Sequence, residues 1–519
     1  MRRPFSSFGF RQLTGWMLGP LCFMFCGLYG PEWGMSIAQA WTAGTVAIMT
    51  VWWITEPVPL WATACVPLFV FPALEVAPLF AVALQYADPV NFLFLGGMMI
   101  ASCMQQWGLH RRIALAIVDA IGASPRRIVL GFMLGTAFIS MWISNTATAM
   151  MMYPIGMSVL IRLREQRVDE VLLARFGLAL MLGIAYAASI GGIGTKIGTA
   201  PNLVFVKLAD PLLNHDVDFL TWLKVGVPIV AIALPLVWLY LVRVAAPLPA
   251  AGFVDSAAYI AEERRRLGEM NPGERIALVA FLTAAGLWIF RKDIELSGFV
   301  IPGWWDLVTW SWADVIGRPL ESLPSPLARL LAQDVGDAAV AMAVGTLLLF
   351  IPVPGERSHR ALSLRNAARV PWGLLVLLGG GFAMAYGIQQ SGLSNWVGGW
   401  LRDLDQLPPL LLMLCVCLIT VILTEVASNV ATANIILPLL AALAAEIGRN
   451  PAPLMMAATI AASFGFMLPA GTPPNAIVFS SGYITVPQMA RSGLLIDLAA
   501  AVLVALACYA LAPWALGLL

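Results

Sequence analysis

The sequence predicts an all-α polytopic membrane protein built from two inverted-topology repeats with broken helices. Two observations carry this prediction: the composition is too apolar for a water-soluble chain, and a set of motifs recurs at a fixed offset. Of the 519 residues, 60% are hydrophobic and only 11% are charged, whereas about 25% are charged in a typical soluble domain. At roughly 20 residues per crossing, the apolar stretches predict about 11 spans.

Several motifs of the first half recur in the second half at one common offset. The GG pair at 96–97 recurs at 380–381, QQWGL at 105–109 as QQSGL at 389–393, SNTATA at 144–149 as SNVATA at 428–433, and Pro154 as Pro438. A further motif, GTAPN at 198–202, recurs as GTPPN at 471–475 with a slightly smaller offset, and an insertion in the polar loop 162–172 accounts for the difference. This self-similarity indicates a membrane protein whose binding site lies where the repeats meet.

The recurring motifs place Ser, Asn, Gly and Pro inside apolar segments, where they interrupt helices. Such breaks are tolerated in a membrane only beside protein or water. The free N–H groups at the start of a half-helix attract anions, and unwound carbonyls and hydroxyls suit a cation such as Na⁺. Helix–helix hydrogen bonding is the alternative explanation for one such motif, but two copies with the same neighbours favour two matched half-sites.

Other functional classes find little support in the sequence. A net charge of +1 and the lack of a basic arm give no indication of nucleic-acid binding. No GxxxxGK[ST] loop is present for ATP, and no HExxH pair indicates a membrane enzyme. The seven cysteines lie in apolar stretches and are interpreted as small buried hydrophobic residues.

The distribution of arginine predicts the orientation in the membrane. Arginines precede the first span and fill the loops 246–272 and 355–370. The positive-inside rule therefore predicts a cytoplasmic N-terminus and an external C-terminus, with the first apolar run kept as an uncleaved span.

The segments ISNTATAMMMYP (143–154) and TEVASNVATANIILP (424–438), with GTAPN and GTPPN, resemble those of the divalent anion/sodium symporters. This family includes bacterial dicarboxylate transporters and animal citrate and dicarboxylate carriers, and the resemblance covers nearly the whole chain. It implies a homodimer in a bacterial plasma membrane. Each protomer would combine a scaffold with an elevator-like transport part that holds two re-entrant hairpins, at about 126–162 and 408–446.

The resemblance also implies a division of the chain. The expected parts are first-repeat scaffold helices at 1–125, a first transport part at 126–245 with a broken helix at 171–208, a cytoplasmic loop at 246–272, second-repeat scaffold helices at 273–406, and a second transport part at 407–519 with a broken helix at 452–482.

The site residues are carried over from the family's motifs. Substrate carboxylates are expected at Asn145, Thr146, Ser428 and Asn429, beside Val430, Thr199, Thr472 and Pro473. One sodium site is expected at Ser140, Ser144, Asn145 and Gly198, and the other at Thr424, Ala427, Asn429 and Gly471. No organic cofactor is expected.

Two residues depart from the family pattern. Val430 stands where the motif has Thr, so one hydroxyl contact to the substrate is lost. Lys196 lies in GGIGTKIGT, where its repeat mate is Pro469. It could bind the anion, replace a sodium ion, or extend its stem to water without a role in coupling. Glu425, three residues before Ser428, would either orient the second tip or form an internal ion pair.

These expectations together predict a secondary active transporter for a C4-dicarboxylate or a related anion such as citrate, coupled to Na⁺. The alternatives left open are a sodium-independent exchanger that uses Lys196 as a fixed cation, a sulfate or other oxyanion transporter, and an anion channel.

Overall fold

The computed structural model describes residues 9–122, 124–213, 216–250, 262–296, 299–305, 336–355, 359–401, 407–447 and 450–518. Regular structure in these residues is helical except for one antiparallel pair of short strands, β1 (Ile294–Leu296) and β2 (Phe299–Ile301), in which Ile294 pairs with Ile301. Ten helices of the described chain are long and apolar enough to cross a membrane. The predicted all-α membrane architecture is confirmed.

The helices of the first repeat are α1 (Phe10–Tyr29), η1 (Gly30–Trp33), α2 (Ile37–Thr55), α3 (Leu60–Thr63), α4 (Val66–Ala73), α5 (Leu79–Leu84), η2 (Gln85–Ala87), α6 (Pro89–Trp107), α7 (Leu109–Ile121), α8 (Pro125–Ser140), α9 (Asn145–Glu165), α10 (Glu170–Ile193), α11 (Ala200–Leu213), α12 (Phe219–Tyr240) and η3 (Leu241–Ala245). Those of the second are α14 (Pro272–Ile289), α17 (Asp337–Leu347), α18 (Leu364–Ala367), α19 (Trp372–Gln390), α20 (Leu393–Leu401), α21 (Pro409–Val426), α22 (Asn429–Ile447), α23 (Ala452–Ala461), α24 (Pro473–Phe479) and α25 (Val486–Ala515).

The helix breaks fall where the recurring motifs predict them. Each SN motif lies between two helices, α8 and α9 in the first repeat and α21 and α22 in the second, and each GTxPN motif lies at the start of a short second half-helix, α11 or α24. The local reason is capping. The hydroxyls of Ser144 and Ser428 accept hydrogen bonds from the backbone N–H three residues later, at 3.4 and 3.3 Å. A side chain that caps the new helix in this way favours a fresh start over continuation of the old one.

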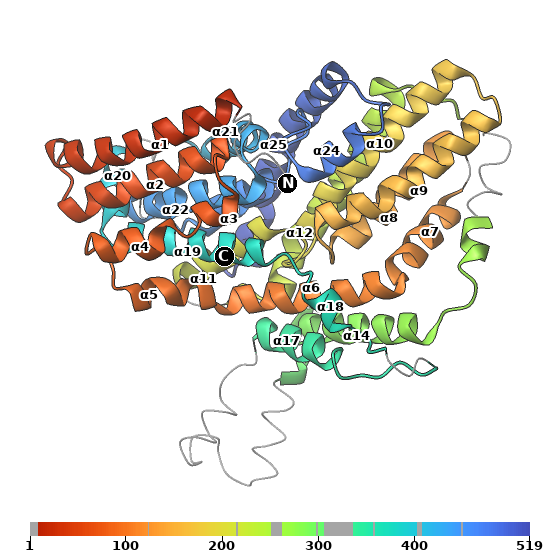
Figure 1. The fold of residues 1–519 in the computed structure, drawn as a ribbon, viewed down its shortest axis with the longest axis horizontal. Coiled ribbons are helices and arrows are strands. Elements are labelled where there is room, and N and C mark those ends of the chain that lie inside the picture. Colours follow the sequence, from red (N-terminus) through yellow and green to blue (C-terminus); the bar gives the residue numbers. More distant parts are fainter. Residues whose placement is uncertain are drawn as a thin grey trace, which may run out of the picture.

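The two hairpins extend in opposite directions. Figure 1 shows α8, α9 and the long α10 in the right half of the view, whereas α22 lies in the left half, where it packs against α2 and α20. Helix α6 packs against α17 and α14, which lie below it in the view. The opposite placement of α9 and α22, which follow equivalent tips, is the arrangement that an inverted-topology repeat requires.

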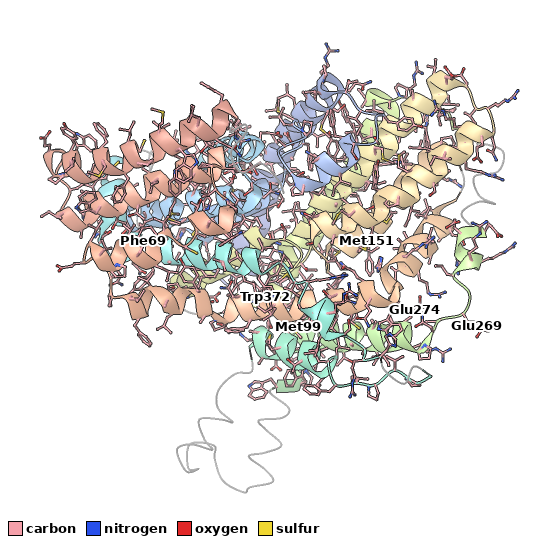
Figure 2. All side chains as sticks on the ribbon, in the orientation of Figure 1. Phe69, Met99, Met151, Glu269, Glu274 and Trp372 are labelled. Carbon is pink, nitrogen blue, oxygen red and sulfur yellow. The ribbon has the colours of Figure 1, made fainter. Side chains whose placement is uncertain are left out.

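The core lies along the two broken helices. Every residue from 176 to 198 is buried, as is every residue from 454 to 466. Helices that are apolar on all sides belong at the centre of a bundle. Small residues let neighbouring backbones approach them: a Cβ on Gly191 of α10 would overlap the backbone of Ala137 in α8. The outer surface is also apolar, as 63% exposure of Phe69 on α4 illustrates (Figure 2).

Close helix packing predicts that two Gly→Ala substitutions differ in their effect on the free energy of unfolding. A Cβ on Gly96 of α6 would overlap the backbone of Ala341 in α17, whereas a Cβ on Gly286 of α14 would meet nothing within 4 Å. We expect Gly96→Ala to lower the free energy of unfolding by about 1–3 kcal/mol through overpacking. Gly286→Ala should leave it unchanged or raise it by up to about 1 kcal/mol. Thermal unfolding of the purified protein in detergent measures both, and equal shifts would contradict the α6–α17 contact.

Candidate functional site

The first hairpin tip is joined to the broken helix α10 by one hydroxyl. Ser140 at the end of α8 places its Oγ 2.9 Å from Oδ1 of Asn145 and 2.6 Å from the carbonyl oxygen of Ala188. All three residues are buried. The amide of Asn145 lies against Gly192, where a Cβ would overlap it. The tip therefore rests directly on the interrupted helix.

The second tip repeats this arrangement. Thr424 places its Oγ1 2.9 Å from Oδ1 of Asn429 and 2.8 Å from the carbonyl oxygen of Ala462. Ser140 and Asn145 are related to Thr424 and Asn429 by the same offset that relates the two SN motifs. The structure thus brings together two side chains of each predicted sodium site, Ser140 with Asn145 and Thr424 with Asn429.

Each of these hydroxyls has one proton but two acceptors within hydrogen-bond distance. The proton can serve only one of them. If it is donated to the helix carbonyl, the hydroxyl and amide oxygens face each other at 2.9 Å with only lone pairs between them. Such a pair needs either the amide turned to present its NH₂ group or a cation beside the two oxygens.

The breaks themselves are held by the asparagines of the GTxPN motifs. Nδ2 of Asn202 donates to the carbonyls of Gly192 and Thr195, at 3.0 and 2.8 Å. In the second repeat Nδ2 of Asn475 donates to Gly465 and Leu468, at 2.9 and 3.0 Å. Donor and acceptors in one repeat are related to those in the other by the offset of the GTxPN motifs. The motif does not by itself indicate this role, although Asn recurs at its last position in both repeats.

A cavity of about 630 Å³ reaches the first tip. Its lining combines the tip with α6 and the segment from α18 to α19: Met98, Ala101, Ser102, Gln105, Gln106, Ile143, Ser144, Thr146, Ala147, Met150, Asn366, Arg369, Val370, Pro371 and Leu374. Arg369 is the one charged residue in this lining. Ser144 and Thr146 face the cavity, whereas Asn145 is turned inward to Ser140.

A second cavity, of about 320 Å³, lies against α19 and α22. Its lining is Gln85, Lys207, Leu208, Pro211, Leu212, Phe382, Ala385, Tyr386, Ile388, Gln389, Ser394, Pro438, Ala441 and Ala442. This lining does not include Ser428, Asn429 or Val430, which are half-buried. One cavity therefore reaches its hairpin tip and the other does not.

The remaining predicted residues lie at the breaks. Gly198 and Gly471 are buried, and a Cβ on Gly198 would meet the carbonyl oxygen of Gly192 at 2.5 Å. Thr472 is buried and caps α24 by accepting the N–H of Asn475. Thr199 is half-buried and Pro473 is exposed. Ala427 is buried in extended backbone directly before the second tip.

Lys196 is held by a buried ion pair. Its Nζ lies 2.9 Å from Oδ2 of Asp337 at the start of α17 and 2.5 Å from the carbonyl oxygen of Val217. Asp337 also lies 3.1 Å from Nε of Arg291. All three charged side chains are buried. Lys196 does not line the cavity at the first tip, and in this state it shares the carboxylate of Asp337 with Arg291.

Glu425 hydrogen-bonds the unwound chain of the second repeat. Its two carboxylate oxygens accept the backbone N–H groups of Met467 and Leu468, at 2.7 and 3.0 Å. These donors lie in the segment between α23 and α24. Glu425 therefore fixes that segment against the end of α21.

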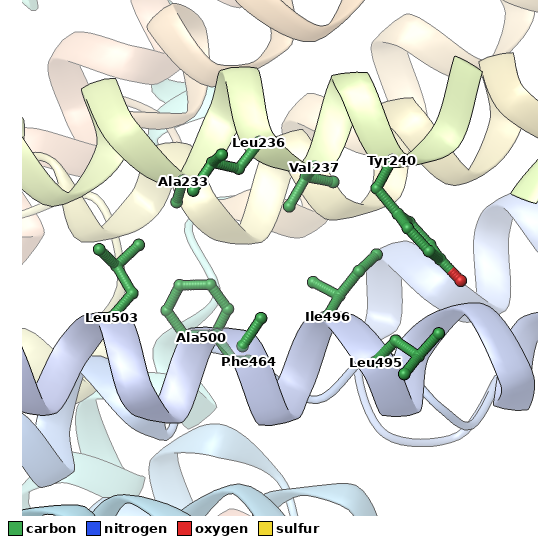
Figure 3. A pocket seen from close by; sticks show the side chains of 10 residues that line it. Ala233, Leu236, Val237, Tyr240, Phe464, Leu495, Ile496, Ala500 and Leu503 are labelled. Atoms are coloured by element: carbon green, nitrogen blue, oxygen red, sulfur yellow. The ribbon is translucent and has the colours of Figure 1, made fainter. Parts of the chain in front are cut away.

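A third cavity, of about 120 Å³, lies between α12 and α25 (Figure 3). Ala233, Leu236, Val237, Phe464, Leu495 and Ile496 contribute apolar side chains, and the phenol of Tyr240 is the one polar side chain in its lining. Because nothing in this lining offers a cation or several hydrogen-bond donors, it does not suit an anion.

A family model and individual relatives both match nearly the whole chain. The model described as the sodium:sulfate symporter transmembrane region matches residues 21–517. A sodium-dependent dicarboxylate transporter, SdcS, of Staphylococcus saprophyticus is 36% identical over 517 residues, which cover 99% of this chain and 94% of the relative. SdcS of Staphylococcus aureus is 35% identical over 521 residues, with 100% and 94% coverage.

A solved structure shares the fold at low sequence identity. MtrF of Neisseria gonorrhoeae, described as illuminating a class of antimetabolite efflux pumps, is 13% identical, with 83% of each chain covered and a TM-score of 0.51.

The charge cluster at Asp337 predicts an order of stability for two variants. Asp337→Asn would leave the Lys196 and Arg291 charges buried without their shared carboxylate, whereas Lys196→Met would leave Asp337 beside Arg291. We expect Asp337→Asn to lower the free energy of unfolding by about 3–5 kcal/mol and Lys196→Met to cost less.

Thermal unfolding of the two variants and of the double variant measures this order. The double variant should be more stable than Asp337→Asn alone, because it removes one of the two buried cations. A larger loss in Lys196→Met than in Asp337→Asn would contradict the shared-carboxylate arrangement.

Proposed function

The chain belongs to the sodium:sulfate symporter family, and from this premise we propose that it carries a C4-dicarboxylate together with Na⁺ by alternating access. Family membership makes it a secondary transporter rather than an enzyme. The relatives that are 35% and 36% identical along nearly its whole length are sodium-dependent dicarboxylate transporters. The site chemistry supports the same substrate class.

The observation that carries the proposal is the cavity at the first tip. It brings the hydroxyls of Ser144 and Thr146, the start of α9 and Arg369 to one space, and no carboxylate lines it within the described residues. A helix N-terminus with free N–H groups attracts a carboxylate. The cavity of about 630 Å³ has room for a small dianion with part of its hydration.

Sodium would occupy the space beside the paired oxygens at each tip. At the first tip these oxygens belong to Ser140 and Asn145, and at the second to Thr424 and Asn429. One hydroxyl proton cannot serve two acceptor oxygens, whereas a cation beside them can interact with both. It also lowers the cost of moving a dianion through a low-dielectric region. Backbone groups of Gly198 and Gly471 at the adjoining breaks would complete the two shells.

Alternating access is supported by a difference in how far the two cavities extend towards their hairpin tips. One reaches its hairpin tip and the other stops short of the equivalent tip. In this proposal the state is open towards the arginine-rich loops, which the positive-inside rule places in the cytoplasm. The parts expected at 126–245 and 407–519 would move as a unit against the remaining helices, in a homodimer of elevator type.

The first experiment is uptake of labelled succinate into proteoliposomes. We expect uptake that requires an inward sodium gradient and needs no internal substrate. Uptake that ignores sodium and requires internal succinate would establish exchange instead and would make Lys196 the leading candidate for the missing cation. Competition by sulfate or citrate in the same assay tests the neighbouring substrate classes. Flux without saturation or counterflow would indicate a channel.

The paired oxygens predict the effect of two asparagine substitutions. Asn145→Ala and Asn429→Ala each remove an amide oxygen from one proposed sodium site, so sodium-dependent uptake should fall at least a hundredfold while the protein stays folded. Asn395→Ala, on the exposed face of α20, is the matched control and should transport normally. Sodium-dependent uptake at the wild-type rate by either tip variant would refute the assignment of that tip.

A further inference from the structure

The two larger cavities are lined by residues that are repeat mates. Met98, Ala101, Ser102 and Gln105 line the cavity at the first tip, and Phe382, Ala385, Tyr386 and Gln389 line the other. The members of each pair, taken in order, are related by the offset of the SN motifs. The cavities are therefore equivalent entrances on opposite sides of an inverted repeat.

The same offset relates Arg369 to Gln85. Arg369 lines the first cavity and Gln85 lines the second, so one entrance has a guanidinium where the other has a neutral amide. The second cavity also contains Lys207, but its ammonium forms an ion pair with Asp88 at the start of α6. Of the two cavities, the first, which is lined by Arg369, therefore has the positive charge that is not held in an ion pair with any described residue.

The backbone of Arg369 is held firmly at the mouth of the cavity. Oε1 of Gln106 in α6 accepts from Nδ2 of Asn366 at 2.7 Å and from the N–H of Ser363 at 3.0 Å, which pins the short helix α18. The N–H of Arg369 then donates to the carbonyl of Asn366 at 3.1 Å. Its exposed guanidinium has no hydrogen bond or ion pair to any residue that the structure describes.

We propose that Arg369 binds the second carboxylate of the dianion on the side of the arginine-rich loops, and that Gln85 at the opposite entrance leaves that face with the weaker affinity. This inference rests on the proposed function. The first carboxylate would lie at Ser144 and Thr146, where α9 begins. A guanidinium matches a carboxylate bidentately, so the arginine selects dianions over monoanions on its own side only.

The alternative explanation is that Arg369 only contributes to the topology, as one of several arginines in a loop that the positive-inside rule makes basic. Arg365 on α18 provides the matched control. It is exposed, carries the same charge four residues away, and does not line the cavity. A general attraction of anions to the loop would be weakened alike by loss of either arginine, whereas a binding contact would depend on Arg369 alone.

The test is the KM for succinate, measured separately from each face in right-side-out and everted vesicles. We expect Arg369→Gln to raise KM about tenfold at the face of the arginine-rich loops, as loss of about 1.4 kcal/mol of binding implies, and to leave the opposite face unchanged. Arg365→Gln should change neither face. Arg369→Lys should restore part of the loss, because it keeps the charge without the bidentate fork.

A swap variant gives an independent readout. Arg369→Gln combined with Gln85→Arg should lower KM at the opposite face while KM stays raised at the arginine-loop face, which reverses the asymmetry. Equal effects of Arg369→Gln and Arg365→Gln, or no effect of either, would overturn the proposal while wild-type succinate transport upholds the proposed function. Absence of succinate transport by the wild type would refute both.

Discussion

A helix that stops inside a membrane leaves carbonyl groups that no water can reach, and the rest of this structure depends on how they are satisfied. Each unpaired group costs several kcal/mol in hydrocarbon. Here one asparagine per repeat, Asn202 or Asn475, donates both amide protons to two carbonyls at the break. Glu425 accepts two N–H groups of the second break. Because these carbonyl and N–H groups are paired, unwound backbone can persist next to the hairpin tips.

The tips use the space that the breaks create. A hydroxyl at the end of each first hairpin arm, Ser140 or Thr424, lies within hydrogen-bond distance of both a tip amide oxygen and a carbonyl of the broken helix. The single proton of the hydroxyl leaves one oxygen pair in each repeat that suits a cation. Binding of that cation would tie hairpin to broken helix, so the proposed sodium sites would also stiffen the surface on which the anion rests.

The repeated features of the fold and site could be predicted from the sequence, and the unrepeated ones could not. The tips at Ser144 and Ser428 lie where the motifs place them, because an SN pair inside an apolar run both caps a helix and recurs at a fixed offset. The pairing of Lys196 with Asp337 joins residues 141 positions apart, and no local pattern indicates it. In the sequence alone Arg369 is one arginine of a basic loop, since a topology signal and a binding residue look alike in one sequence. The cavity lining distinguishes Arg369 from Arg365.

This division has a physical reason. An inverted repeat exchanges the environments of its two halves when access alternates, so groups needed in both states must occur twice. The hydroxyl–amide pairs and the asparagine clamps do occur twice, which fits cations that stay bound while the protein moves. Arg369 and Gln85 differ, as do Thr146 and Val430 at the tips. The difference between Arg369 and Gln85 would act in one state only, because each lines a different cavity, and it would set how tightly each face holds the anion. The symmetric residues would couple the ions to movement, and the asymmetric residues would give the two faces unequal affinity.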